Sequence, residues 1–192
     1  MHISFICDPF VPQGIRKVFK QTIEDLRKIF PVIDYSVETK ESLTHHQTAG
    51  EVHSSKIFQK KHINGNKHYF VYVVSGKLFS RKCEVYGVSV RNVCVVGLKD
   101  IPRTSYEIWS SLVWELILHE LGHSFGLVPR NRRSIDVNRF NVIHCTNNCV
   151  MSDEVAYKKW FKKALLRKQT RIAYCEICTA FLKKNSIQPL PS

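Results

Sequence analysis

Residues 105–126 read SYEIWSSLVWELILHELGHSFG, and this stretch decides the fold of the chain. Thr104 and Glu107 form a T-x-x-E capping box, which predicts a helix from about Ser105 to Gly126. A broad apolar face marks it as a core helix, with Trp109, Leu112, Val113, Leu116 and Ile117. Gly126 is suited to end the helix in a left-handed turn.

Three polar side chains stand near the end of this helix as H-E-x-x-H, namely His119, Glu120 and His123. Residues four apart on a helix lie one above the other, about 5–6 Å apart. Two imidazoles at this spacing can share one zinc ion at about 2.0–2.1 Å each. Glu120 lies beside the pair, where it is suited to take a proton from zinc-bound water rather than to bind the metal. The three residues predict a catalytic zinc site with Glu120 as general base.

The bare motif has a second interpretation, since a helix can carry two histidines and a glutamate for solubility. The apolar character of the helix favours the metal site, because both histidines would otherwise need partners. The motif also continues as H-E-x-x-H-x-x-G through residues 124–126 (SFG). His144 and Cys145, and then residues 149–151 (CVM), follow downstream.

Four of the seven cysteines lie in the C-terminal quarter as a C-x3-C and a C-x2-C pair: Cys145, Cys149, Cys175 and Cys178. The chain begins without a signal-peptide pattern, so this spacing favours zinc over disulfides. Four reduced, buried thiols are the alternative. The other three, Cys7, Cys83 and Cys94, lie in strand-like apolar runs and are expected to be buried.

At these residues the sequence resembles the metzincin clan of metallopeptidases, whose motif H-E-x-x-H-x-x-G-x-x-H precedes a methionine turn. It is most similar to the archaemetzincins, which add cysteines for a second, structural zinc. Over about 119–178, the resemblance implies that His119 and His123 bind the catalytic zinc and that Met151 lies beneath it. It also implies a structural zinc on the four C-terminal cysteines, hence two zinc ions per chain.

The chain departs from that pattern at the third histidine, where it has Pro129. The nearest suitable histidine is His144, so residues 128–142 are interpreted as an insertion that loops out and returns. We favour His144 because its neighbour Cys145 would be anchored by the second zinc. Asp136 is the alternative ligand, since some metzincins use aspartate; with neither, the site would be inactive.

Upstream, a strand at 3–7, a helix at 13–30 and a strand at 32–37 predict a right-handed βαβ unit with parallel strands. Residues 38–67 are polar and predict a long loop or a mobile insertion. Their histidines, His45, His46, His53 and His62, are not expected to bind metal. Further strands are predicted at 69–74, 84–90 and 92–97.

The net charge is +13, and the densest basic run is Lys158–Arg171. It predicts an amphipathic helix at about 154–171, with Trp160, Phe161, Leu165 and Leu166 toward the core. On the central helix, Glu115 is expected to be exposed, with a hydrogen bond to the zinc ligands as the alternative. No apolar run approaches the roughly 18 residues of a membrane span, so we expect a soluble, cytoplasmic protein.

Together these features predict a metzincin-like α/β (α+β) fold. Residues 1–126 form an N-terminal lobe with a mixed sheet and the active-site helix; residues 127–192 form a small zinc-stabilised lobe. The predicted function is zinc-dependent hydrolysis of peptide bonds in a peptide or protein substrate. Rival interpretations are an inactive metallopeptidase fold and a zinc-ribbon module in which 158–171 contacts nucleic acid, the less favoured partner.

Overall fold

The structure is a computed structural model of the 192-residue chain. It describes residues 1–41, 47–48, 51–54, 57, 68–80, 83–103, 105–129, 135–137, 142–152, 157–170 and 173–186. Within these residues, every helix is too short or too polar to cross a membrane.

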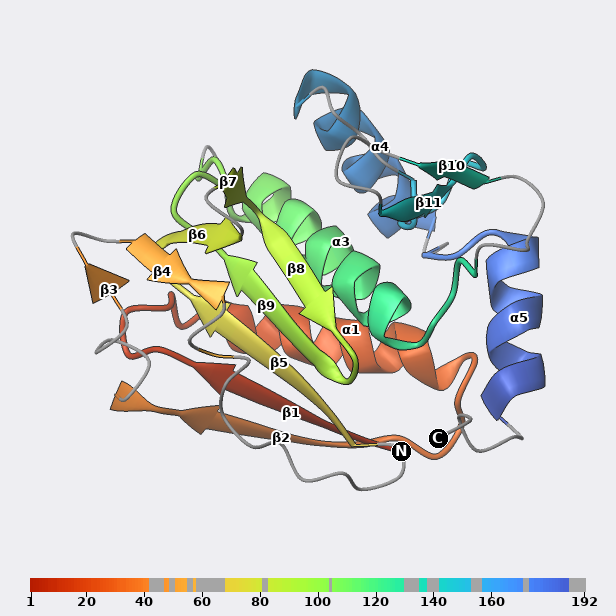
Figure 1. The fold of residues 1–192 in the computed structure, drawn as a ribbon, viewed down its shortest axis with the longest axis horizontal. Coiled ribbons are helices and arrows are strands. Elements are labelled where there is room, and N and C mark those ends of the chain that lie inside the picture. The colour runs from red at the N-terminus through yellow and green to blue at the C-terminus, as the bar shows by residue number, and fades with distance from the viewer. Residues whose placement is uncertain are drawn as a thin grey trace.

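A five-stranded mixed sheet forms the centre of the molecule, in the order β2-β1-β5-β9-β8 (Figure 1). Its strands are β1 (His2–Cys7), β2 (Asp34–Thr39), β5 (His68–Val74), β8 (Gly87–Val90) and β9 (Val93–Gly97). The first four strands in spatial order are parallel, and only β8, at the edge, is antiparallel to its neighbour. Because α1 (Ile15–Arg27) connects the parallel strands β1 and β2, the predicted βαβ unit is confirmed.

The segment after β2 differs from the prediction of a long loop. It contains β3 (Gln47–Thr48) and β4 (Glu51–His53), which join β6 (Lys77–Ser80) and β7 (Cys83–Val85) in a four-stranded sheet. The predicted strand 84–90 is divided between two sheets, since β7 pairs with β6 and β8 pairs with β9. His45, His46 and His62 lie outside the described residues.

The central helix α3 spans Tyr106–Ser124. It begins one residue later than predicted, because its N-cap is Ser105, whose hydroxyl accepts from the Ile108 amide at 3.2 Å. Thr104 lies outside the described residues. At the other end, Gly126 has φ +69°, and the Gly126 and Leu127 amides donate to the carbonyls of His123 and Gly122. This is the Schellman arrangement, so the predicted left-handed end of the helix is confirmed.

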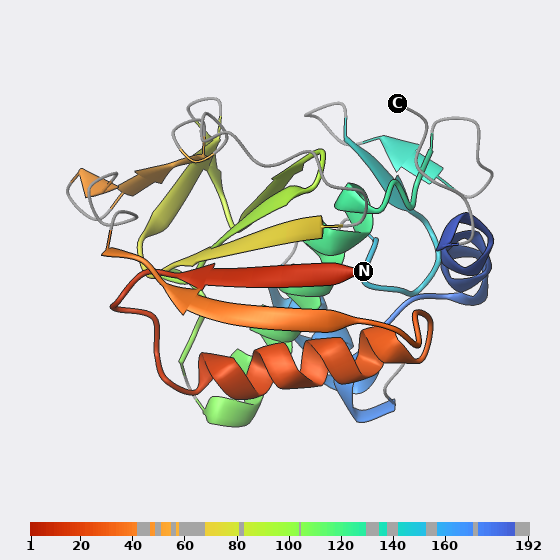
Figure 2. The same ribbon diagram turned by 90° about the horizontal axis from the view of Figure 1, so that it is seen from below.

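Helices α1 and α3 cover one face of the sheet (Figure 2). The main core lies between these layers and extends to the C-terminal segments through Cys149, Met151 and Trp160. The first strand shows the underlying pattern, since Ile3, Phe5 and Cys7 alternate into this core. Helix α3 is buried almost all round, as expected for a helix with apolar residues on every side.

The C-terminal part is a two-stranded hairpin and two helices (Figure 1), of which α4 packs against α3 through contacts to Ser110 and Glu115. The hairpin pairs β10 (Ile135–Val137) with β11 (Ile143–Cys145), and the helices are α4 (Tyr157–Thr170) and α5 (Glu176–Ser186). Residues 128–142, interpreted from the sequence as an insertion that loops out and returns, therefore include a strand. Helix α5 was not predicted from the sequence, although the pair Cys175 and Cys178 lies at its start. In α4, Leu166 is 52% exposed rather than in the core, whereas Arg167 is 2% exposed.

Candidate metal centres

The structure brings His119, His123 and His144 together from two elements that are distant in sequence. The first two lie one turn apart on α3, and His144 lies in the middle of β11. One ring nitrogen of each lies within 4.8 Å of those of the other two. The third position in the motif, Pro129, is not part of this group.

The distances between the rings suit a shared metal ion. The Nε2 atoms of His119 and His123 are 3.1 Å apart, and the His144 ring centroid lies 5.2 Å and 5.1 Å from those two rings. Two zinc–nitrogen bonds of about 2.0–2.1 Å at a tetrahedral angle place their nitrogens roughly 3.3 Å apart. The measured separation is close to this value, so the three imidazoles fit one zinc ion.

A backbone carbonyl fixes the orientation of His119. The Nδ1 atom of His119 lies 2.5 Å from the Val150 carbonyl oxygen. A carbonyl oxygen only accepts, so Nδ1 carries the hydrogen and Nε2 is left with a lone pair for a metal. Burial, together with the neighbouring His119 and His144, lowers the pKa of His123 to about 2. The neutral form that a metal ligand requires is therefore favoured at His123.

Glu120 lies in the same turn of α3 as His119, and its side chain points toward the edge strand β8. Its side chain is buried, and its Oε2 accepts a hydrogen bond from the Ser89 hydroxyl on β8. A Cβ atom on Gly87 would lie 2.5 Å from Glu120 Oε1, so only glycine leaves room for the carboxylate at this point of the strand. Burial raises the pKa of Glu120, while His119 and the Ser89 hydrogen bond lower it. The sequence interpretation did not identify Ser89 or Gly87, because nothing in a short strand marks which residue faces a helix.

Met151 packs against the helix between the two motif histidines. It is fully buried, and a Cβ atom added to Gly122 would overlap its sulfur. Gly122 therefore provides the space that Met151 occupies beside His123. This is the neighbourhood that the resemblance implied for the methionine turn.

The four C-terminal cysteines form a second cluster. Their sulfur atoms all lie within 4.8 Å of one another, with Cys145 and Cys175 3.9 Å apart and Cys149 and Cys178 3.7 Å apart. A disulfide would require about 2.05 Å. Four zinc–sulfur bonds of about 2.3 Å in a tetrahedron place the sulfurs roughly 3.8 Å apart, which the measured distances match. The hydrogen bond with the Cys178 thiol is the main cause that lowers the pKa of Cys149 to about 5, which favours the thiolate.

The two clusters meet in β11, where His144 and Cys145 are consecutive. Asp136 stands opposite His144 across the hairpin, but it is not part of the histidine group. Its Oδ1 accepts from the amide of its neighbour Val137, and the side chain is exposed. Between the two proposed third ligands, the geometry thus places His144 and not Asp136 beside the pair.

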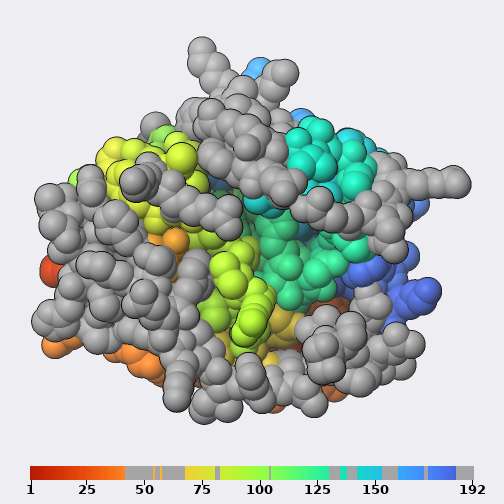
Figure 3. Space-filling view, in the orientation of Figure 1, coloured from red at the N-terminus to blue at the C-terminus, as the bar shows by residue number. Residues whose placement is uncertain are grey.

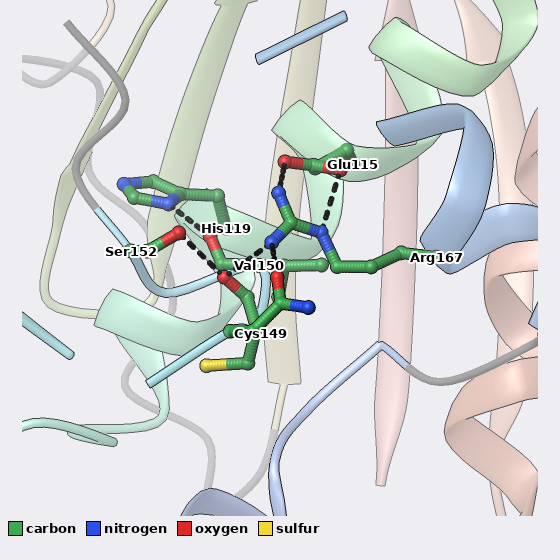
Figure 4. A network of polar contacts seen from close by, with 7 residues as sticks. Glu115, His119, Cys149, Val150, Ser152 and Arg167 are labelled. Atoms are coloured by element: carbon green, nitrogen blue, oxygen red, sulfur yellow. Dashed lines mark hydrogen bonds and ion pairs between the residues drawn. The ribbon is translucent and has the colours of Figure 1, made fainter. Parts of the chain in front are cut away.

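Glu115 is buried, contrary to the expectation of an exposed carboxylate. It forms a two-pronged ion pair with Arg167 of α4, in which the side chains are 4% and 3% exposed (Figure 4). A signal was present in the sequence: Glu115 is the only charged residue between Trp109 and Leu118, and a charge in such a run needs a buried partner.

The remaining cysteines divide into two groups. Cys7 and Cys94 are buried as predicted, and burial raises the pKa of both thiols. Cys83 is exposed, so that prediction is wrong. It begins β7, in a short outer strand rather than in the central sheet.

Comparison with known proteins identifies a fold. No protein-family description matches the chain, and no curated protein matches it significantly. The crystal structure of archaemetzincin from Methanopyrus kandleri is similar with a TM-score of 0.75 and 17% identity, over 98% of this chain and 96% of that one. Archaemetzincin from Archaeoglobus fulgidus, in complex with malonate, gives a TM-score of 0.61 and 17% identity, over 94% and 99%. The chain therefore has an archaemetzincin-like fold, and the predicted α/β architecture is confirmed.

Proposed function

We propose that this protein is a zinc-dependent peptidase whose catalytic zinc is held by His119, His123 and His144. One observation carries the proposal: a histidine 21 positions beyond His123 lies against the motif pair, within ligand distance of both. An incidental pair on a helix does not explain why a third imidazole is buried beside it. Three protein ligands are the usual number in a catalytic zinc site.

Zinc at such a site lowers the pKa of a coordinated water to about 7 and polarises the scissile carbonyl. The chain supplies the proton transfer. Glu120 takes the proton from the attacking water and passes it to the leaving amine. Ser89 and the space beside Gly87 hold the Glu120 carboxylate in place while leaving it next to the ligands.

The substrate is proposed to be an extended peptide that lies along β8. This strand is the edge of the central sheet, and it contacts α3 directly. Figure 3 shows residues of α3 at the surface between β8 and the β10–β11 hairpin. An exposed antiparallel edge can bind an extended chain through main-chain hydrogen bonds, which is β-strand addition.

The second zinc is proposed to be structural, with Cys145, Cys149, Cys175 and Cys178 as ligands. Sites with four thiolates are closed, with no open position for water. Three of the four are buried, which agrees with a site that stabilises the fold. Cys178 belongs to α5, so a zinc ion here would tie the last helix to the strand that carries His144.

The test uses Glu120→Ala, measured on a substrate that the wild-type protein cleaves in a peptide library. We expect bound zinc and melting temperature to be kept while turnover falls by about 100- to 10,000-fold, the usual cost of losing a general base. Glu107→Ala, in the first turn of the same helix, is the matched control and should cleave normally. Wild-type turnover by Glu120→Ala would exclude the mechanism, and wild-type protein that binds zinc without cleaving the library would favour the inactive fold.

A further inference from the structure

Arg167 occupies an unusual position for an arginine, because it is almost completely buried between α4 and α3. Its Nη2 atom lies 2.5 Å from Glu115 Oε1, and its Nε lies 3.1 Å from Glu115 Oε2. This is the bidentate geometry that a planar guanidinium makes with a carboxylate. Glu115 lies on α3, one turn before His119. The bidentate contact therefore fixes Arg167 to the helix that carries the histidine pair.

The remaining side of the guanidinium faces the loop before Met151. The Nη1 atom donates to the Cys149 carbonyl at 3.1 Å and to Asn148 Oδ1 at 3.0 Å. The Ser152 hydroxyl and amide also donate to the Cys149 carbonyl, at 2.8 Å and 3.0 Å. Arg167 therefore joins the helix to the backbone of this loop through a single rigid group.

The next carbonyl along the loop completes a ring of contacts. It belongs to Val150 and accepts from His119 Nδ1 (Figure 4). The ring runs from Glu115 to Arg167, from there to the Cys149 carbonyl, and through one peptide to Val150 and back to the same helix at His119. The two carbonyls belong to consecutive peptides joined at the Val150 Cα, so a displacement of the Cys149 carbonyl would shift the backbone that carries the Val150 carbonyl.

We propose that Arg167 is a positioning residue for the histidine metal site. It holds the Cys149 carbonyl, and through it the backbone of Val150, so that the Val150 carbonyl orients His119 Nε2 toward the metal. Groups that hydrogen-bond a metal ligand fix its tautomer and ring orientation, and their loss typically weakens metal affinity about 10- to 100-fold. The inference rests on the proposed function only in its metal-binding part, and not on catalysis.

The competing explanation is that the ion pair merely stabilises the packing of α4 on α3. A single substitution cannot separate the two, because it would leave one charge buried and unpaired. Replacing both members with apolar residues of similar volume is often neutral for stability. The double variant Glu115→Leu/Arg167→Met therefore removes the contact to the Cys149 carbonyl while the fold is kept.

The experiment titrates Co²⁺ into metal-free wild-type and variant protein under reducing conditions. The intense thiolate-to-cobalt absorption band reports the cysteine site, together with the ligand-field bands that rise in step with it. Ligand-field absorption that grows without any further thiolate-to-cobalt absorption reports the histidine site. In the double variant we expect the dissociation constant of the histidine site to rise by about 10-fold, the lower end of the range for direct partners of a ligand, and its ligand-field spectrum to change. The melting temperature and the cysteine-site band should stay as in the wild type.

Lys168→Met is the matched control, because Lys168 joins the same two helices through the Ser110 hydroxyl at 2.6 Å without touching the loop. It should leave cobalt binding at the histidine site unchanged, and an effect equal to that of the double variant would overturn the proposal. So would unchanged affinity and spectrum in a folded double variant. If the double variant does not fold, Arg167→Lys is the variant that tests the proposal. It keeps a positive charge beside Glu115 but lacks the planar guanidinium that makes the bidentate contact. With Arg167→Lys, a wild-type spectrum would overturn the proposal. A wild-type protein with no cobalt at the histidines would overturn both this inference and the proposed function.

Discussion

Gly122→Ala tests the packing of the methionine against the zinc helix. An alanine Cβ at this position would overlap the Met151 sulfur and lie 3.1 Å from Leu127 Cδ1. Overpacking of this kind costs about 1–3 kcal/mol. The same change adds roughly 0.8–1.0 kcal/mol of helix propensity. The net effect is an expected loss of up to about 2 kcal/mol, or a melting temperature lower by several degrees.

A double-mutant cycle with Met151→Ala isolates the overlap. In that background the sulfur is gone, so Gly122→Ala should stabilise the protein by up to about 1 kcal/mol through helix propensity. The sign of the effect reverses, and the interaction energy between the two positions should be about 1–3 kcal/mol. Urea denaturation of zinc-loaded protein in a reducing buffer measures all four members of the cycle.

Gly126→Ala, in the turn that ends the same helix, is the matched control. A Cβ at this position meets no atom within 4 Å, but the residue has φ +69°. The expected loss of about 1–2 kcal/mol therefore comes from backbone strain, and it should be the same with Met151 or Ala at position 151. Equal effects of Gly122→Ala in both backgrounds would refute the packing argument.

Further predictions concern the metals. Native mass spectrometry should find two zinc ions per chain, and one or none in folded protein would remove a site. His144→Ala should strongly weaken zinc binding at the histidine site and abolish cleavage, whereas Asp136→Ala should leave both nearly intact; the reverse ranking would transfer the role to Asp136. Cys178→Ser should lower the melting temperature and the zinc content, because zinc binding stabilises the fold; no change in either would indicate plain buried thiols.

The parts of the site that could be predicted are those whose residues lie close together in the sequence. His119 and His123 follow from one turn of a helix, and the cysteine pairs follow from the C-x3-C and C-x2-C spacings. His144 could be predicted as the third ligand only from its position next to Cys145 and from the resemblance to the archaemetzincins, because 20 residues separate it from His123. The sequence alone leaves Asp136 as an alternative, and in the structure Asp136 pairs with His144 across the hairpin but has an exposed side chain outside the histidine group.

The parts that could not be predicted depend on tertiary contacts. In α4, helical periodicity assigned Leu166 to the core, but the buried Glu115 carboxylate selects Arg167 for that face instead. The strands β3 and β4 are very short and polar, and they form only because β6 offers a partner to β4. Propensity carries little information about such pairings, since the packing environment decides them.

The hairpin has a consequence for how such proteins change over evolutionary time. Strands β10 and β11 are antiparallel, so the chain leads away from α3 in β10 and back toward it in β11, whatever the length of the segment between them. Lengthening a loop is thermodynamically cheap, at about 0.6 kcal/mol for each doubling. The interval between the second and third histidines is therefore free to drift by insertion, while the return point at Ile143 keeps the imidazole in place.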